Sequence, residues 1–342
     1  MLGLSTGLMY NTNSFQGIFD IDFETPIDIS GCVGWWDFTD SSTMYTNYNP
    51  NTGFPDYTPL APTGTPSNGD EVERIDNKAY YLQSDLSAAL GRYLFGSKAY
   101  YNGYDGEGPG QNSKSYIELW GAGSRFYSGK WQGVGSGGTG NDVNIFNWPL
   151  SETTVSLDNF TIFLVADARH TDGRAFSIFG DKEDANDSSR KEFHLYYDKT
   201  STTAGQYKMD CYDGSTTTTI SSGTAGKSDN FHIITGVLSG SGDSQLYRDG
   251  DNTDGTTSAS SGSGSIDITH SSPDIYQQEN RIVVGRNLNL GSSSDSTVVS
   301  PQWEWGKLQN SKIYEIICYS KELNSSELEL VETFLKTKYD IS

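Results

Sequence analysis

Between residues 157 and 319 the chain is a succession of short apolar or alternating segments, each followed by turn-forming residues. The clearest are "DNFTIFLVADAR", "EFHLYYD", "QYKMDCYDG", "FHIITGVLSG" and "SKIYEIICY". They recur roughly every 10–15 residues with no helical pattern between them, which is typical of antiparallel sheets. The sequence therefore predicts an all-β fold, an antiparallel β-sandwich.

A packed core is compatible with this composition, although hydrophobic residues make up only 34% of the chain. Aromatic residues reach 13%, and each buries a large area, so a sandwich can form and a wholly disordered chain is excluded. Stretches rich in Gly, Pro, Ser and Asn at about 46–70 and 96–142 predict long loop insertions. Residues 1–30 predict an N-terminal arm or linker, which is either an attachment device or an ordinary disordered terminus.

One amphipathic helix is predicted at the C-terminal end, within "NSSELELVETFLKTKYDIS". Asn324, Ser325 and Ser326 offer N-cap oxygens, and Ser326 with Glu329 fits a capping box. The apolar residues at helical spacing are Leu328, Val331, Phe334 and Leu335. The acidic residues Glu327, Glu329 and Glu332 are expected on the solvent side. The helix should cover part of the sandwich, which is a packing role. Farther upstream, "SDLSAALGRYL" (84–94) predicts one or two helical turns.

The charge, hydropathy and cysteine content of the chain limit which binding partners and which cellular compartment can be expected. A formal charge of −21 without a Lys/Arg cluster excludes nucleic-acid binding, which needs a basic face. No apolar run approaches the ~18 residues of a membrane span, so membrane insertion is not expected. Three cysteines, an odd and sparse set, do not form a disulfide framework and fit folding in a reducing cytoplasm.

Several of these segments resemble the concanavalin A-like (laminin-G-like) jelly-roll family. The resemblance rests on "FTIFLVADAR…AFSIFG", "FHIITGVLSGSGDSQLYRDG", "RIVVGRN" and "SKIYEIICYSKELNSSELELVETFLKTKY". In that family the last strand carries Ile, Glu and Tyr where this chain has Ile313, Glu315 and Tyr319, and a polar turn and terminal helix follow. The resemblance implies one jelly-roll domain over residues 31–342.

A second resemblance is to virion structural proteins of tailed bacteriophages, especially marine cyanophages, that carry this jelly roll. It rests on "MLGLSTG", "WWDFTDSSTMYT" and "RIDNKAYYLQSDLSAALGRYL". It implies localisation in the virion, assembly in the host cytoplasm, homo-oligomerisation and contacts with capsid, neck or tail subunits. The fold alone does not decide function, since sandwiches host lectins, hydrolases and scaffolds.

Catalytic patterns are weak in the sequence. Glycoside hydrolysis needs two carboxylates flanking the scissile bond, and no single strand offers them at i, i+2 or i+4. Glu315 is expected to be alone on its strand, so a hydrolase would need carboxylates brought together from distant strands. The four histidines are scattered, without metal-ligand spacing.

Binding sites are the remaining candidates. Exposed aromatic rings stack on sugars and anchor protein partners, and the aromatic candidates are Tyr101, Tyr104, Trp120, Trp131 and Trp148. A loop resembling a calcium site carries Asp249, Asp251 and Asp254, with a solvated acidic turn as the alternative. No cofactor other than calcium is expected.

These observations predict a non-enzymatic virion structural protein, such as a capsid decoration, fibre or tail component. The alternative is a glycan-binding adhesin that recognises host-surface glycans, and the third reading is a glycoside hydrolase.

Overall fold

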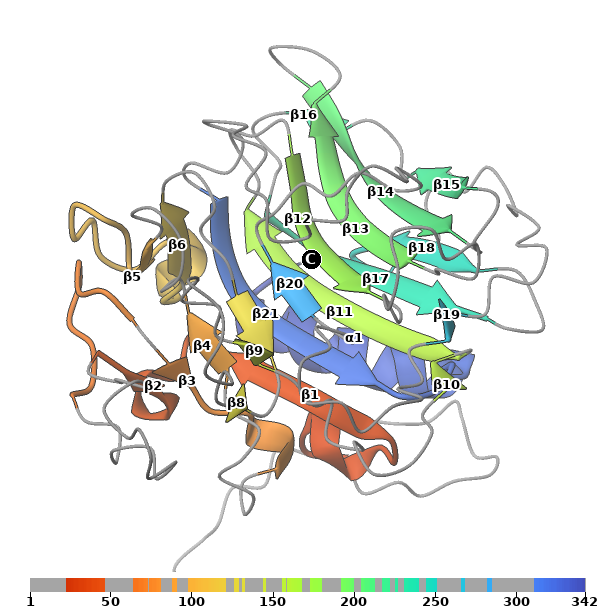
Figure 1. Ribbon diagram of the computed structural model, residues 1–342, viewed down its shortest axis with the longest axis horizontal. Helices are drawn as coiled ribbons and strands as arrows, with labels where there is room; N and C mark the ends of the chain where they lie inside the picture. The colour runs from red at the N-terminus through yellow and green to blue at the C-terminus, as the bar shows by residue number, and fades with distance from the viewer. Residues whose placement is uncertain are drawn as a thin grey trace, which may run out of the picture.

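A computed structural model describes residues 23–46, 64–72, 74–80, 88–90, 98–120, 126–128, 131–132, 144–145, 156–157, 159–167, 173–179, 192–199, 204–212, 217–221, 225–226, 231–239, 244–250, 266–267, 282–284 and 311–341. These residues form antiparallel sheets and a single α-helix, α1 (Ser325–Tyr339), at the C-terminal end. The predicted all-β sandwich with one C-terminal helix is therefore confirmed (Figure 1).

The first sheet has seven strands. Its order is β18 (Gln245–Arg248), β17 (Phe231–Leu238), β11 (Phe160–Asp167), β21 (Ser311–Tyr319), β6 (Ile117–Trp120) and β5 (Lys98–Tyr101), and β1 (Cys32–Asp37) also pairs with β21. β6 and β1 share one edge of β21, since β6 pairs with residues 311–313 and β1 with residues 315–319. The first and last long strands of the described chain are thus hydrogen-bonded neighbours.

The second sheet has ten strands. Its order is β15 (Thr217–Ser221), β14 (Ala204–Tyr212), β13 (Glu192–Lys199), β12 (Gly173–Phe179), β20 (Ile282–Val284), β7 (Phe126–Ser128), β4 (Ala88–Leu90), β3 (Arg74–Ile75) and β2 (Met44–Tyr45), with β16 (Ala225–Gly226) on β14. Two small pairs join β10 (Ser156–Leu157) to β19 (Ile266–Asp267) and β8 (Trp131–Gln132) to β9 (Asn144–Ile145). Short 3-10 turns occupy η1 (Pro26–Asp28), η2 (Ser41–Thr43), η3 (Lys78–Tyr80) and η4 (Gln111–Ser113).

The helical turns predicted over 84–94 are wrong at their centre. Ala88–Leu90 is strand β4, paired on both sides with β3 and β7. Backbone pairing within the sheet overrides the helical propensity of alanine and leucine at these positions.

Period-two alternation along β11 divides the apolar residues into two layers. Ile162 and Leu164 belong to the core shared with strands of the second sheet. Phe163 and Val165 belong to a separate apolar cluster that includes the buried residues of α1. The first sheet is therefore buried on both faces, and we call the face that carries Phe163 and Val165 its outer face.

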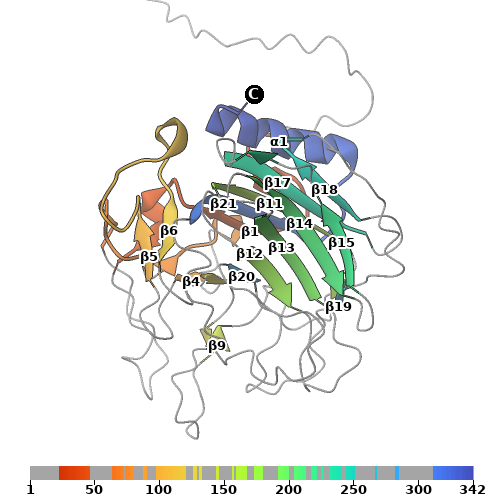
Figure 2. The ribbon, with the colours of Figure 1, turned by 90° about the horizontal axis from the view of Figure 1, so that it is seen from above.

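α1 lies along this outer face, as Figure 2 shows. Its buried apolar residues are Val331, Leu335 and Tyr339. Of the three predicted N-cap residues, Asn324 is the N-cap: its Oδ1 accepts from the amide of Glu327 at 3.0 Å, and the Glu327 carboxylate accepts from the Asn324 amide at 3.1 Å. The box is therefore Asn324–Glu327 and not Ser326–Glu329, because the helix begins at Ser325.

A β-bulge alters the alternation of β21. Val165 of β11 lies opposite Glu315 and Ala166 lies opposite Ile313, so Tyr314 is the extra residue. Tyr314 belongs to the outer-face cluster, and the Glu315 carboxylate also bonds to α1. The bulge thus places two consecutive side chains under the helix.

Residues 23–30, which fall within the expected arm, also pack on this face. The Phe23 ring meets the Phe334 ring of α1 edge-on at 6.2 Å between centroids. The Tyr319 hydroxyl donates to the carbonyl of Pro26 at 2.8 Å. The segment thus contacts both β21 and α1, and its Ile29 is fully buried.

Candidate functional site

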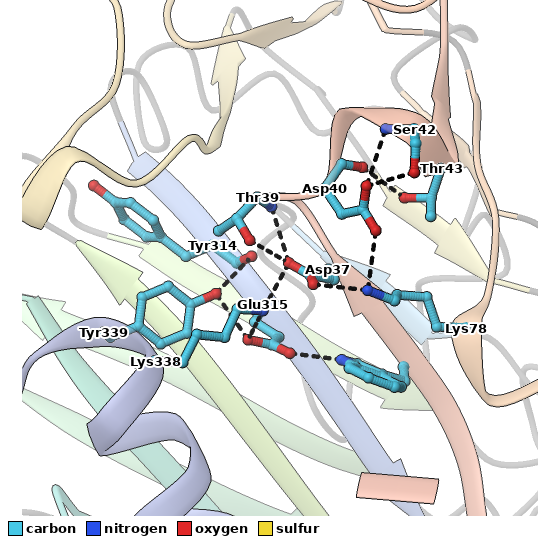
Figure 3. A network of polar contacts seen from close by, with 11 residues as sticks. Asp37, Thr39, Asp40, Ser42, Thr43, Lys78, Tyr314, Glu315, Lys338 and Tyr339 are labelled. Carbon is cyan, nitrogen blue, oxygen red and sulfur yellow. Dashed lines mark hydrogen bonds and ion pairs between the residues drawn. The ribbon is translucent and has the colours of Figure 1, made fainter. Parts of the chain in front are cut away.

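A polar network of the described residues lies between the first sheet and α1, around two carboxylates (Figure 3). The antiparallel register of β1 and β21 puts Asp37 directly opposite Glu315. Asp37 is 4% exposed and Glu315 is fully buried. Glu315 is the only acid of β21, as expected, and a strand from the opposite end of the chain brings a second carboxylate, Asp37, beside it.

Two lysines neutralise this pair. The Lys338 ammonium of α1 lies 2.8 Å from Asp37 Oδ1 and 2.8 Å from Glu315 Oε2. Lys78 of η3 lies 3.0 Å from Asp37 Oδ2 and 3.1 Å from Asp40 Oδ2. A buried charge is tolerated when it is paired and hydrogen-bonded, and each of the two buried carboxylates here touches an ammonium.

Hydrogen bonds occupy the other oxygens. Trp35 Nε1–H donates to Glu315 Oε1 at 2.6 Å, and the Tyr339 hydroxyl donates to Glu315 Oε2 at 2.8 Å. The Thr39 hydroxyl donates to Asp37 Oδ1 at 2.6 Å. Trp35 belongs to β1, and Figure 3 shows Thr39 in the turn after β1 and Tyr339 in the last turn of α1. Every carboxylate oxygen of the pair has a partner.

The electrostatics of the two acids differ. Burial raises the pKa of Asp37, but Lys338 and Lys78 outweigh that effect and lower its pKa from 3.8 to about 2. Burial also raises the pKa of Glu315; Lys338 opposes this rise, and the neighbouring Asp37 adds to it. Asp37, which touches both lysines, is the more firmly ionised member of the pair.

This arrangement stabilises the fold. A general acid or nucleophile must reach a substrate, whereas the oxygens of Asp37 and Glu315 are used by side chains of the chain itself. Glu332 of α1, expected on the solvent side, is another buried acid: its carboxylate accepts a hydrogen bond from the Thr235 hydroxyl of β17. Polar contacts therefore fix α1 to three strands, β1, β21 and β17.

A second group of polar and aromatic residues lies where β5 and β6 end the first sheet. Tyr104 is 46% exposed, and its ring meets the Tyr100 ring edge-on at 4.8 Å between centroids. Tyr101 is only 8% exposed, and its hydroxyl donates to the Ser115 hydroxyl at 2.9 Å. Among these tyrosines, Tyr104 has the ring that a ligand can reach. We call the exposed residues Asn68 and Tyr104, together with the buried residues Tyr100, Asn102 and Glu118 that contact them, the Tyr104 surface.

Glu118 distinguishes this surface from the buried network. It is 5% exposed, and its Oε2 accepts from the Tyr104 amide at 2.8 Å. No lysine or arginine of the described residues lies within ion-pair distance of it. Burial raises its pKa; the Tyr104 amide and Lys312, which lies opposite Glu118 on β21, oppose the rise, and Glu107 adds to it. Asn102 Nδ2 donates to Asn68 Oδ1 at 2.7 Å, which adds amide groups beside the exposed ring.

The other predicted binding residues stay predictions. Trp120 ends β6 and Trp131 begins β8, and the structure describes their backbone only. Trp148 lies outside the described residues, as do Asp251 and Asp254 of the calcium loop.

Asp249, the remaining residue of the calcium loop, is engaged within the chain. Its Oδ2 lies 2.6 Å from His232 Nδ1, and its Oδ1 accepts from the Ile233 amide at 2.8 Å. Within the part of the chain that the structure describes, no three His, Cys, Asp or Glu side chains are grouped as a metal ion would require.

Sequence reasoning missed Asp37, Lys78 and Lys338. Two of them could have been noticed in the sequence. Asp37 directly follows the apolar segment "VGWW". Lys338 lies one helical turn after Phe334, so it is on the apolar side of the predicted helix. Their meeting depends on the register of β1 against β21, which no local pattern specifies.

Comparisons with known proteins show similarity of fold class alone. No protein-family model matches the chain, and no curated protein matches it. Trypanosoma rangeli sialidase in complex with 2,3-difluorosialic acid aligns with a TM-score of 0.43 and 11% identity over 91% of this chain. The receptor-binding domain of botulinum neurotoxin C/D mosaic serotype aligns with a TM-score of 0.41 and 9% identity over 89% of this chain.

The chain spans 33% of the length of that sialidase and 51% of the toxin chain. Among the described residues, no helix has the length and apolar character needed to cross a bilayer.

Proposed function

We propose that this chain is a non-enzymatic structural protein of a tailed-phage virion, built on a lectin-like sandwich that mediates assembly or surface attachment. The virion part rests on the resemblance of "MLGLSTG", "WWDFTDSSTMYT" and "RIDNKAYYLQSDLSAALGRYL" to such proteins. The non-enzymatic part rests on one observation. Lys338 bridges Asp37 and Glu315 under α1, so the two acids that meet in the fold serve its stability.

Mass spectrometry of purified particles tests the virion role. The chain is expected at many copies per particle, as a capsid decoration, fibre or tail component. Its absence from particles that carry the corresponding gene contradicts the proposal. Light scattering of the purified chain measures the homo-oligomeric state that the virion role implies.

A deletion tests the attachment role of the N-terminal arm. Removing residues 1–30 would also remove the Pro26 carbonyl that Tyr319 binds, so the cleaner variant lacks residues 1–22 and keeps Phe23. We expect this variant to unfold like the full chain and to be missing from particles. Incorporation at the full-length level would rule out residues 1–22 as the attachment device.

A glycan-binding adhesin is the second candidate, and the Tyr104 surface favours it. An exposed tyrosine ring offers a stacking face for the CH groups of a sugar, and the exposed Asn68 side chain, which is hydrogen-bonded to Asn102, offers an amide for hydroxyls. On a glycan array, Tyr104→Ala is expected to lose any binding that the full chain shows. Tyr101→Phe, which removes only the hydroxyl on Ser115, is the matched control. Arrays with and without calcium test the calcium loop of Asp249, Asp251 and Asp254.

A glycoside hydrolase is the third candidate, and the Asp37–Glu315 pair is the observation in its favour. Both carboxylates touch one ammonium, so they are as close as the pair of a retaining hydrolase. Release of reducing sugar from polysaccharides by the full chain, lost in Glu315→Gln, would establish this activity in place of the structural role. We expect no release.

A further inference from the structure

The buried network joins the two ends of the described chain, and its charges depend on the last turn of α1. Asp37 belongs to β1 and Glu315 to β21, and Lys338 is the last basic residue of the sequence. The charged and titratable groups that face Glu315 are Asp37 from β1, Lys338 and Tyr339 from α1, and, through Asp37, Lys78 from η3.

Without α1 the β1–β21 pair carries an electrostatic conflict. Like charges directly opposite one another in an antiparallel pair destabilise it, and the conflict grows when the side chains are shielded from water. Lys78 reaches Asp37 and Asp40 but makes no ion pair with Glu315. The charge that relieves Glu315 therefore comes from Lys338.

Docking of α1 also completes the hydrogen bonds of the pair. Glu315 Oε2 accepts from both Lys338 and the Tyr339 hydroxyl, which are consecutive residues of the helix. The same helix covers Phe163, Val165 and Ile317 on the outer face. Undocking would expose this apolar layer and leave Glu315 with the Trp35 indole as its remaining donor among the described residues.

We propose that Lys338 acts as an electrostatic latch that makes the pairing of β1 with β21 and the docking of α1 a single cooperative event. The first strand of the sandwich then closes fully only once the final helical turn is in place. This device concerns folding and is independent of the function proposed above.

The test compares four full-length proteins by hydrogen exchange at pH 7: the native chain, Lys338→Met, Lys338→Met with Glu315→Gln, and Lys336→Met. Methionine keeps most of the length of lysine without its charge. Lys336 lies in the last turn of α1, as Lys338 does, and makes no ion pair with a described residue, so it is the matched control. Peptides covering β1 and α1 report the latch, and peptides covering β13 and β14 report the second sheet.

In Lys338→Met we expect exchange to accelerate at least about tenfold in β1 and α1 together, while β13 and β14 keep their native rates. Lys336→Met should exchange like the native chain. The double variant should recover most of the protection, because Glu315→Gln removes the excess negative charge and keeps an acceptor for the Trp35 indole. Acidification should likewise protect Lys338→Met, since protonating Glu315 removes the same charge.

Three results would overturn the latch. One is native exchange rates in Lys338→Met. Another is fast exchange of α1 with β1 still protected, which would make the two events independent. The third is a double variant no better protected than Lys338→Met, which would assign Lys338 a packing role. If Lys338→Met does not fold, the double variant decides: a folded double variant supports the latch and an unfolded one refutes it.

Discussion

The two carboxylate sites of the first sheet are almost equally buried, yet they differ in what neutralises them. Asp37 and Glu315 each contact a lysine ammonium within 3.0 Å and also accept hydrogen bonds from neighbouring side chains. Glu118 has one backbone hydrogen bond and an exposed tyrosine ring beside it. A compensated acid supports the fold, and removing it costs stability. Glu118, whose raised pKa is only partly opposed by Lys312 and the Tyr104 amide, costs stability when it is ionised, so a hydrogen-bond donor on a ligand would lower that cost.

The same substitution in both regions gives the largest contrast. Glu315→Leu leaves the Trp35 indole and the Tyr339 hydroxyl without their acceptor, and should lower the free energy of unfolding by about 3–5 kcal/mol. Glu118→Leu removes one hydrogen bond from the Tyr104 amide and should lower it by no more than ~1 kcal/mol. Denaturant unfolding at pH 7 measures both variants. Equal losses would erase the distinction between the two regions.

The dependence of the free energy of unfolding on pH also distinguishes the two regions. The pKa of Asp37 is lowered from 3.8 to about 2, so its contribution is complete above the unfolded value and disappears as the pH falls through about 2. At ~1.4 kcal/mol per pKa unit, this contribution is roughly 2 kcal/mol. Glu315 and Glu118, whose pKa values are raised, give the opposite slope above pH 4.5 and do not produce this loss.

Asp37→Asn should therefore show a shallower decline of the free energy of unfolding below pH 4 than the native chain; Asp28 and Asp40, whose pKa values are also lowered, account for the decline that remains. Glu329→Gln, an exposed change on α1, should keep the native decline. A decline in Asp37→Asn as steep as that of the native chain would assign it to other acids.

Removing the charge of Glu118 should stabilise the protein. Glu118→Gln keeps an acceptor for the Tyr104 amide and removes a carboxylate whose pKa is raised by burial. We expect a gain of less than ~1 kcal/mol at pH 7 that vanishes below pH 4.5, where the acid is protonated in both states. Glu107→Gln loses an ion pair with Lys312 and should show no gain. A loss in Glu118→Gln would mean that its charge is compensated.

The smallest stability effect is expected at the exposed ring. Tyr104→Ala should change the free energy of unfolding by under ~1 kcal/mol, because nearly half of Tyr104 is already in contact with water. Phe163→Ala, in the layer under α1, should lose about 3–5 kcal/mol. Thermal unfolding of the two variants ranks them, and a reversed order would place Tyr104 in the core.

Sequence patterns predicted the strands well because alternation is local. "FTIFLVAD" and "FHIITGVL" became the adjacent strands β11 and β17, and the C-terminal helix formed where its apolar spacing indicated. Asn324 was among the predicted N-caps, but the capping box was placed two residues too late, since Asn324 and Ser326 both offer a suitable oxygen.

The site was not predictable in the same way. Asp37 and Glu315 stand near opposite ends of the chain, and their contact follows from the register of two strands. Glu332 was assigned to solvent because acidic residues are rarely buried without a partner, and its partner Thr235 belongs to a distant strand. Tyr104 was identified from its aromatic loop, whereas the burial of Tyr101 three residues before it depends on packing with Ser115.

The bulge at Tyr314 has a consequence for how β21 tolerates changes of length. If Tyr314 is left out, the side chains of β21 alternate regularly between the two faces of the sheet. Those of Ile313, Ile316 and Cys318 face the core between the sheets, and those of Glu315 and Ile317 lie on the outer face. Deleting Tyr314 would therefore shorten the chain and leave the other side chains on their present sides. Deleting Ile316 would instead move the side chains on one side of the deletion to the opposite face of the sheet. Position 314 can therefore gain or lose a residue while the other side chains of β21 stay on their present faces.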